Sequence, residues 1–173
     1  SDDSKENKEG AVDVDKNILT VDITFPASFF GEDGVMADFD PDTYVAENGF
    51  EKAVVNDDGS VTVTMTKSKH KELMDEMTAS IDETFNEMIS DEDAPYIEKI
   101  TPSKDYSSVE VLVDRAGYDS AWFDMTPFAI GFQVMFYQVF AGDDLHCEVT
   151  MKYSDNNEVI STTVYPDAME SDE

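Results

Sequence analysis

The segment TPFAIGFQVMFYQVFAG, residues 126–142, has no charged side chain, although it belongs to a chain whose formal net charge is -29. Three structures are compatible with such a run: a membrane span, the wall of a ligand pocket, and a helix of the protein core. Its two ends and the distribution of its side chains distinguish between them.

The ends of this segment oppose a membrane span. Thr126 and Pro127 resemble an N-cap and a proline at the first helical position, and Ala141-Gly142 is typical of a helix end. The helix between them has about 14 residues and a length of about 21 Å, less than the ~30 Å hydrocarbon core of a bilayer. Acidic residues flank it, whereas membrane spans are oriented by positive flanks. We therefore expect no transmembrane segment.

Apolar side chains cover most of the circumference of this helix, which predicts burial on more than one side. They are Phe128, Phe132, Met135, Phe136, Val139 and Phe140. We expect a central core helix between a sheet and a second helix. In the alternative, one side lines an apolar pocket or the interface of a homodimer. The ligand-pocket candidates are then Phe132, Gln133, Tyr137 and Gln138.

Most of the remaining chain reads as strands. Residues 18–25 (ILTVDITF) alternate between apolar and polar side chains, as half-buried strands do. Residues 52–66 predict a hairpin that turns at Asp58-Gly59, and residues 96–114 and 146–166 predict two more. Residues 68–90 repeat apolar side chains every three or four positions, which predicts a long amphipathic helix.

These elements predict an α+β fold, a twisted antiparallel sheet of about six or seven strands with two main helices packed on one face. The opposite face is Thr-rich and either solvated or available to a partner. We expect a disordered acidic leader over residues 1–17, a single domain over 18–166, and an acidic tail over 167–173.

The charge of the chain restricts its partners. Forty acidic residues stand against eleven basic ones, which opposes binding to phosphate backbones. We therefore expect no nucleic-acid partner, and instead an unknown protein or small ligand.

The residues that usually carry out catalysis are few. Cys147 is the only cysteine, so the chain has no internal disulfide, and its strand pattern predicts that it faces the core while His146 faces outward. The two therefore cannot act together as nucleophile and base. His70 lies among lysines and is expected to be solvated. No common catalytic motif is present, so an uncharacterised hydrolase ranks last among the functions considered.

One acidic turn resembles part of a calcium loop. Asp38, Asp40 and Asp42 follow one another at every second position, and calcium favours several carboxylates from a short loop. The EF-hand pattern is broken, because Thr43 stands where Gly is needed and Gly49 where Glu is needed. Solvated acidic turns are the simpler interpretation. A calcium-responsive surface protein remains an alternative, and no other cofactor is expected.

The overall pattern of the chain resembles that of small secreted lipoproteins of Gram-positive bacteria whose function is unknown. A polar leader is followed by LTVDITFPASFF, NDDGSVTVTM, KSKHKELMDEM and FYQVFAG. The resemblance implies a removed signal peptide with a lipidated Cys upstream of Ser1 and an extracytoplasmic, surface-anchored or secreted location. It implies no active-site residues. We therefore expect a non-enzymatic binding or interaction domain.

Overall fold

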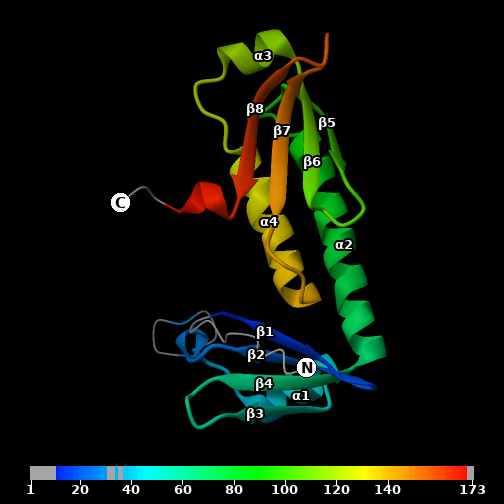
Figure 1. Ribbon diagram of the computed structural model, residues 1–173, viewed down its shortest axis with the longest axis vertical. Coiled ribbons are helices and arrows are strands. Elements are labelled where there is room, and N and C mark those ends of the chain that lie inside the picture. Colours follow the sequence, from blue (N-terminus) through cyan, green and yellow to red (C-terminus); the bar gives the residue numbers. More distant parts are fainter. Residues whose placement is uncertain (1–10, 31–33, 35–36, 171–173) are drawn as a thin grey trace, which may run out of the picture. The chain divides into compact units, whose positions relative to one another are not determined.

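The computed structural model describes residues 11–30, 34 and 37–170, and the chain divides into two compact units. Unit 1 comprises Ser1–Asp75 and Val139–Gly142, and unit 2 comprises Glu76–Gln138 and Asp143–Glu173. Figure 1 shows that each unit has its own sheet. The structure thus has two units where we expected one domain, because the strands bury their apolar sides in two separate clusters.

The sheet of unit 1 is antiparallel throughout and has the strand order β1-β2-β4-β3. Its strands are β1 (Asp13–Lys16), β2 (Thr20–Phe25), β3 (Lys52–Val55) and β4 (Val61–Thr66). The predicted alternation in β2 is confirmed, since Val21, Ile23 and Phe25 are buried. The hairpin between β3 and β4 is also confirmed, and Gly59 in its turn has a φ of 84°.

Unit 1 also contains two short helices, η1 (Ala27–Phe29) and α1 (Pro41–Asn48). The expected disorder of residues 1–17 does not hold for Asp13–Lys16, which pair with β2, and Val14 among them is buried. The first ten residues of that expected leader lie outside the described residues. The expected acidic tail begins with η2 (Asp167–Met169), and residues 171–173 are likewise outside.

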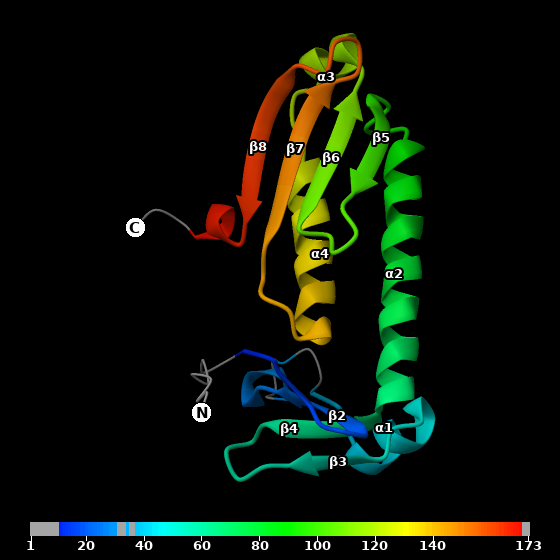
Figure 2. The same ribbon diagram turned by 45° about the vertical axis from the view of Figure 1, so that its right-hand side comes forward.

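The sheet of unit 2 has the order β5-β6-β7-β8 (Figure 2). Its strands are β5 (Ile97–Pro102), β6 (Ser108–Val113), β7 (Cys147–Tyr153) and β8 (Val159–Tyr165). The hairpins β5–β6 and β7–β8 are antiparallel, as predicted, but β6 and β7 are parallel. Parallel neighbours need a long connection, and here it contains α3 (Arg115–Ser120) and α4 (Thr126–Ala141).

The predicted α+β class is confirmed, whereas the predicted single sheet is wrong. In the described residues, eight strands form two sheets of four, and one pair of strands is parallel. Alternating side chains identify a strand and its buried face, but they do not identify its neighbours. The sequence pattern therefore could not predict which strands pair with one another.

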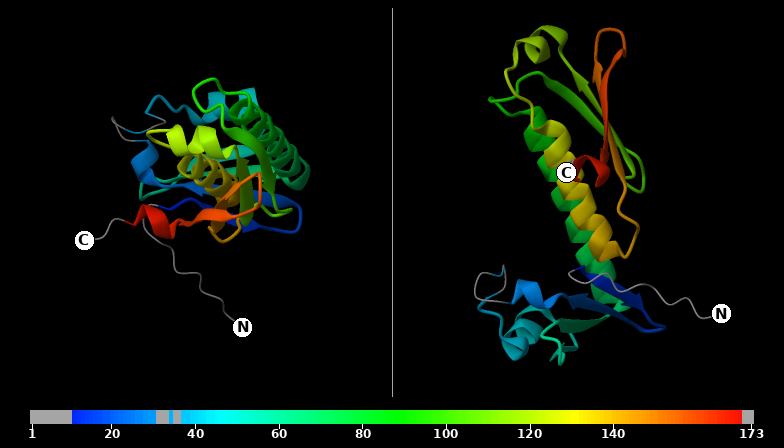
Figure 3. Two further views of the ribbon diagram at one scale, coloured as in Figure 1. Left: turned by 90° about the horizontal axis from the view of Figure 1, so that it is seen from above. Right: turned by 60° about the vertical axis from the view of Figure 1, so that its left-hand side comes forward.

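Two helices cover one face of the unit 2 sheet, as Figure 3 shows. One is α4, and the other is the C-terminal part of α2 (Lys67–Ile89), which contributes Ile81 and Phe85. Ile130 and Val134 of α4 meet the valines of β6 in a shared core. This layer is therefore the predicted arrangement of two helices on one apolar face.

Gly131 allows α4 to approach β8 closely. A β-carbon at this position would lie 2.7 Å from Cγ of Tyr165, closer than such atoms pack. The Tyr165 ring is 5% exposed and packed in the core, so it has little room to move. Gly131 thus fixes the rotation of α4 about its own axis and the side that it buries.

Replacing Gly131 with Ala should destabilise unit 2. Alanine favours a helix over glycine by up to about 1 kcal/mol, but overpacking a core costs typically 1–3 kcal/mol. We expect the free energy of unfolding to fall by about 1 kcal/mol or more, measured by urea denaturation with an unchanged slope. The control is Ala129→Gly on the same helix, which measures the effect of helix propensity alone. A more stable Gly131→Ala variant would contradict the close approach.

Candidate functional site

One side of α4 stays exposed although its side chains are apolar. Phe128, Phe132 and Phe136 recur at every fourth position and are 41%, 56% and 54% exposed, whereas Ile130 and Val134 are fully buried. The expected core helix is therefore confirmed for one side only. Burial of Phe128, Phe132 and Phe136 was expected and is wrong, because the sheet and α2 cover only part of the helix.

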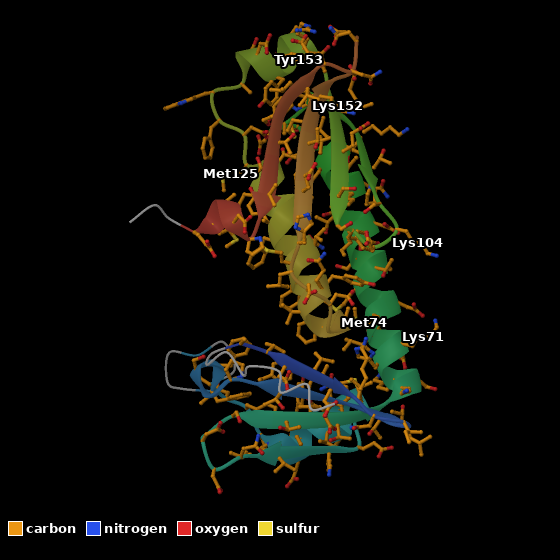
Figure 4. The ribbon with its side chains drawn as sticks, in the orientation of Figure 1. Lys71, Met74, Lys104, Met125, Lys152 and Tyr153 are labelled. Atoms are coloured by element: carbon orange, nitrogen blue, oxygen red, sulfur yellow. The ribbon has the colours of Figure 1, made fainter. Side chains whose placement is uncertain are left out.

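The segment that leads directly into α4 also exposes large apolar side chains. Trp122 is 97% exposed, Phe123 75% and Met125 49%. Figure 4 labels Met125 on the connection between α3 and α4. The rings of Phe128 and Phe132 stack with their centroids 6.2 Å apart. We call the surface formed by Trp122, Phe123, Met125, Phe128 and Phe132 the aromatic face.

The sequence did contain a signal for the aromatic face. Trp122 and Phe123 are large apolar residues outside every predicted helix and strand, where no core position accounts for them. Isolated exposed apolar residues are common in proteins, but neighbouring ones form a patch, which usually marks an interaction site.

Hydrogen bonds beneath the aromatic face hold its connecting segment in place. The Tyr96 hydroxyl donates to Oδ1 of Asp124 at 2.8 Å, and the same oxygen accepts from the Thr126 hydroxyl at 2.6 Å and from its backbone N–H at 3.1 Å. Burial, with the hydrogen bond to Asp124, raises the pKa of Tyr96, which stays a donor at neutral pH. Trp122 and Phe123 are therefore presented by an anchored backbone.

An aromatic and ionic cluster anchors α3, on the other side of this segment. The Tyr118 ring meets Tyr96 edge to face at 5.6 Å and lies 6.3 Å from the ring of Tyr153. Arg115 lies 3.7 Å above the Tyr153 ring and pairs with Asp155 at 2.7 Å. The connection from α3 to α4 is thus fixed at both ends.

The four pocket candidates do not converge. Phe132 belongs to the aromatic face, and Gln133 donates to Oγ1 of Thr84 on α2 at 3.2 Å. The Tyr137 ring packs 5.1 Å from that of Tyr106. Gln138 is 3% exposed and faces the core. Each side chain has a separate protein environment, so the structure does not bring them together around a ligand.

Gln138 connects α4 to the start of β7. Its Nε2 donates to the His146 carbonyl at 2.7 Å, and its Oε1 accepts from the His146 N–H at 3.0 Å. One buried amide thus satisfies both backbone groups of a residue in the connection that follows α4. This role is structural, and the sequence did not reveal it.

The outer face of the unit 2 sheet is the other surface that we considered for a partner. It contains an open hollow lined by residues that include Thr101, Thr150 and Glu110. Lys152, labelled in Figure 4, lies there and pairs with Glu110 at 2.6 Å. Two of the charged side chains of this face, Lys152 and Glu110, are therefore paired with each other.

The acidic turn near α1 has a structural role of its own. Oδ1 of Asp40 caps α1 by accepting from the Thr43 N–H at 2.9 Å, and this hydrogen bond lowers the pKa of Asp40. Asp42 lies in the first turn of α1, and Asp38 lines an open hollow beside it. Within the described residues, no three acidic, His or Cys side chains form a group that could hold a metal ion. Calcium binding here stays a prediction.

The cysteine and histidines occupy three different environments. Cys147 is fully buried, which raises its pKa to about 11, and His146 is exposed, so their predicted opposite directions are confirmed. The prediction that His70 is solvated is wrong. It is 9% exposed, and its Nε2 lies 2.9 Å from the Phe140 carbonyl oxygen. The last turn of α4, which belongs to unit 1, covers it.

Gln138→Met should destabilise the protein by about 1–3 kcal/mol, since it leaves a backbone N–H and a carbonyl of His146 without their partners. The matched control is Gln133→Met, which removes a single, longer hydrogen bond at a partly exposed position and should cost at most about 1 kcal/mol. Urea denaturation of both variants measures the difference. Equal stabilities would contradict the connecting role of Gln138.

Cys147 should resist alkylation in the native protein, because its buried thiol is almost wholly protonated at neutral pH. Iodoacetamide labelling followed by mass spectrometry measures this. We expect modification only as fast as the strand around Cys147 opens, and rapid modification in denaturant. Fast stoichiometric labelling under native conditions would show that the thiol is accessible.

No helix in the described part of the chain is both long and apolar enough to cross a membrane. Comparison with known proteins adds no assignment: no protein family, no curated protein and no solved structure matches the chain. The resemblance to Gram-positive lipoproteins therefore rests on the quoted sequence segments alone.

Proposed function

We propose that this protein is a non-enzymatic binding domain and that a protein partner docks on the aromatic face. The observation that carries the proposal is the exposure of Trp122 and Phe123, in the segment that leads into α4, together with the exposed Phe128–Phe132 stack in its first turns. Aromatic side chains are enriched at protein interfaces and at the residues that dominate their affinity. These apolar side chains are exposed in a chain that has forty acidic residues.

The size of the aromatic face supports a protein partner. Large apolar side chains contribute about 200 Å² each, so the exposed fractions correspond to roughly 600–700 Å². That is at or above the largest patch of a typical monomer, ~300–600 Å², and close to the ~800 Å² that each partner contributes to a standard interface.

The anchoring of the aromatic face also supports binding. Asp124 and Tyr96 hold the backbone beneath it, so little conformational entropy is lost when Trp122 and Phe123 are covered. The two-ring stack of Phe128 and Phe132 is already formed on a rigid helix. A surface of this kind is preorganised for docking.

The extracytoplasmic location belongs to the same proposal. Its support is the resemblance of the leader and the following segments to secreted lipoproteins. A surface-anchored domain with a docking face would hold its partner at the cell exterior.

Site-specific photo-crosslinking in cells that make the protein tests this function. A photoreactive phenylalanine analogue replaces Phe132, and the control places it at Val55, which is 58% exposed in unit 1. We expect a discrete protein adduct from position 132 and none from 55. Phe128→Ser should reduce that adduct at least tenfold while lowering the free energy of unfolding by at most about 1 kcal/mol, as exposed substitutions do.

The crosslinked protein is then identified, purified and tested for direct binding to the intact chain. Absence of an adduct at position 132, or the same adducts from both positions, would contradict a docking role. An adduct that persists undiminished in Phe128→Ser would also contradict it, since the stacked ring would then contribute nothing.

A further inference from the structure

The part of the chain that carries the aromatic face is acidic. Between Arg115 and Lys152 the chain has five acidic residues and no Lys or Arg. Unit 2 as a whole has 22 acidic residues and four basic ones. Arg115 pairs with Asp155 and Lys152 with Glu110, so two of the four positive charges are already engaged. The aromatic face is thus an uncharged surface in a strongly negative environment.

From this charge distribution, and resting on the function proposed above, we infer that the partner docks an amphipathic helix whose apolar side is flanked by Lys and Arg. Apolar side chains of that helix cover Phe128 and Phe132, and its basic flanks meet the acidic surroundings. Complementary charges speed encounter and exclude wrong partners, while the apolar centre supplies most of the affinity.

The geometry of α4 fits a helical partner. Phe128 and Phe132 form a row at i and i+4, the ridge that packs into the groove of a second helix. The 16 residues of α4 span about 24 Å at ~1.5 Å per residue. A partner helix of about 16–18 residues therefore matches its length. Recognition of amphipathic helices by apolar surfaces is a recurrent mode of peptide binding.

Charge disfavours the other occupants of this surface. A second copy of the chain would bring two acidic rims together, and like charges at an interface are costly. Anionic lipid surfaces and nucleic acids repel the chain for the same reason. A basic helix is the occupant for which the apolar centre and the charged surroundings both contribute favourably.

The test uses the intact chain and two model peptides of about 18 residues, ~27 Å long as helices. Both place Leu on one helical side, and one carries Lys and the other Glu on the opposite side. Neither contains Trp, so the single tryptophan of the chain, Trp122, reports docking through its fluorescence. Its 97% exposure predicts a shift to shorter wavelength when a helix covers it.

We expect the Leu/Lys peptide to bind with this shift and the Leu/Glu peptide to bind at least tenfold more weakly. The double variant Phe128→Ser/Phe132→Ser should lose at least tenfold in affinity for the Leu/Lys peptide, whereas the matched control Val55→Ser should retain it. Affinity for the Leu/Lys peptide should fall as salt is raised, because the charge attraction is screened.

Several outcomes would overturn this inference. If the Phe128→Ser/Phe132→Ser variant binds the Leu/Lys peptide with undiminished affinity, the peptide is held by unspecific charge attraction. If both peptides bind equally, or if neither binds, basic flanks do not determine which helix docks. Dimerisation that the same variant abolishes would identify a second copy as the occupant. A Trp122 shift on zwitterionic vesicles would identify a lipid surface. Only crosslinking at position 132 tests the proposed docking function itself, so the two failures are distinguishable.

Discussion

The close approach of α4 to Tyr165 at Gly131 is the constraint on which the arrangement of unit 2 depends. A helix that is apolar on every side has no preferred face of its own, so something other than hydrophobicity must set its rotation. The missing β-carbon of Gly131 places that side of α4 against β8. Ile130 and Val134 are fully buried in the core, whereas Phe128 and Phe132 are 41% and 56% exposed. The close approach at Gly131 thus belongs to the packing that buries one side of α4 and leaves another in water.

Polar contacts around α4 make this rotation definite. Gln138 satisfies the backbone of His146 at the end of the helix, and Asp124 joins Tyr96 to Thr126 at its start. Such buried hydrogen bonds add little net stability, but a rotated helix would leave them unmade, and unsatisfied groups are expensive. The same hydrogen bonds therefore favour one rotation of α4 and, with it, the exposure of Phe128 and Phe132. Phe128 and Phe132 thus lie on a rigid helix, and the hydrogen bonds of Asp124 hold the segment that carries Trp122 and Phe123, which suits a docking role.

Some of this was predictable from local patterns. The alternation in residues 18–25, the Asp58-Gly59 turn and the spacing of Ile81 and Phe85 each depend on neighbours in sequence, so the strands, hairpins and long helix were predicted. The division into two sheets and the parallel pairing of β6 with β7 depend on contacts between distant segments, and periodicity carries no information about them. The candidate site divides in the same way. The apolar character of residues 126–142 was evident from the sequence. Gln133, Tyr137 and Gln138 were only candidates for a pocket, as an alternative to the core helix, because the sequence does not determine which side of the helix faces the rest of the protein.

By itself the sequence determined the charge of the protein, its α+β class, the ends of the uncharged helix and the buried position of Cys147. These properties follow from composition and from periods of two and 3.6 residues, which act over short distances along the chain. Only the tertiary structure decided that Phe128 and Phe132 are exposed, that Trp122 and Phe123 are exposed as well, and that Gln138 and His70 are buried. The reason is that burial is a property of contacts between elements. The sequence of a helix that is apolar on most sides allows any of those sides to be buried. Only the elements that pack against the helix decide which side remains in water.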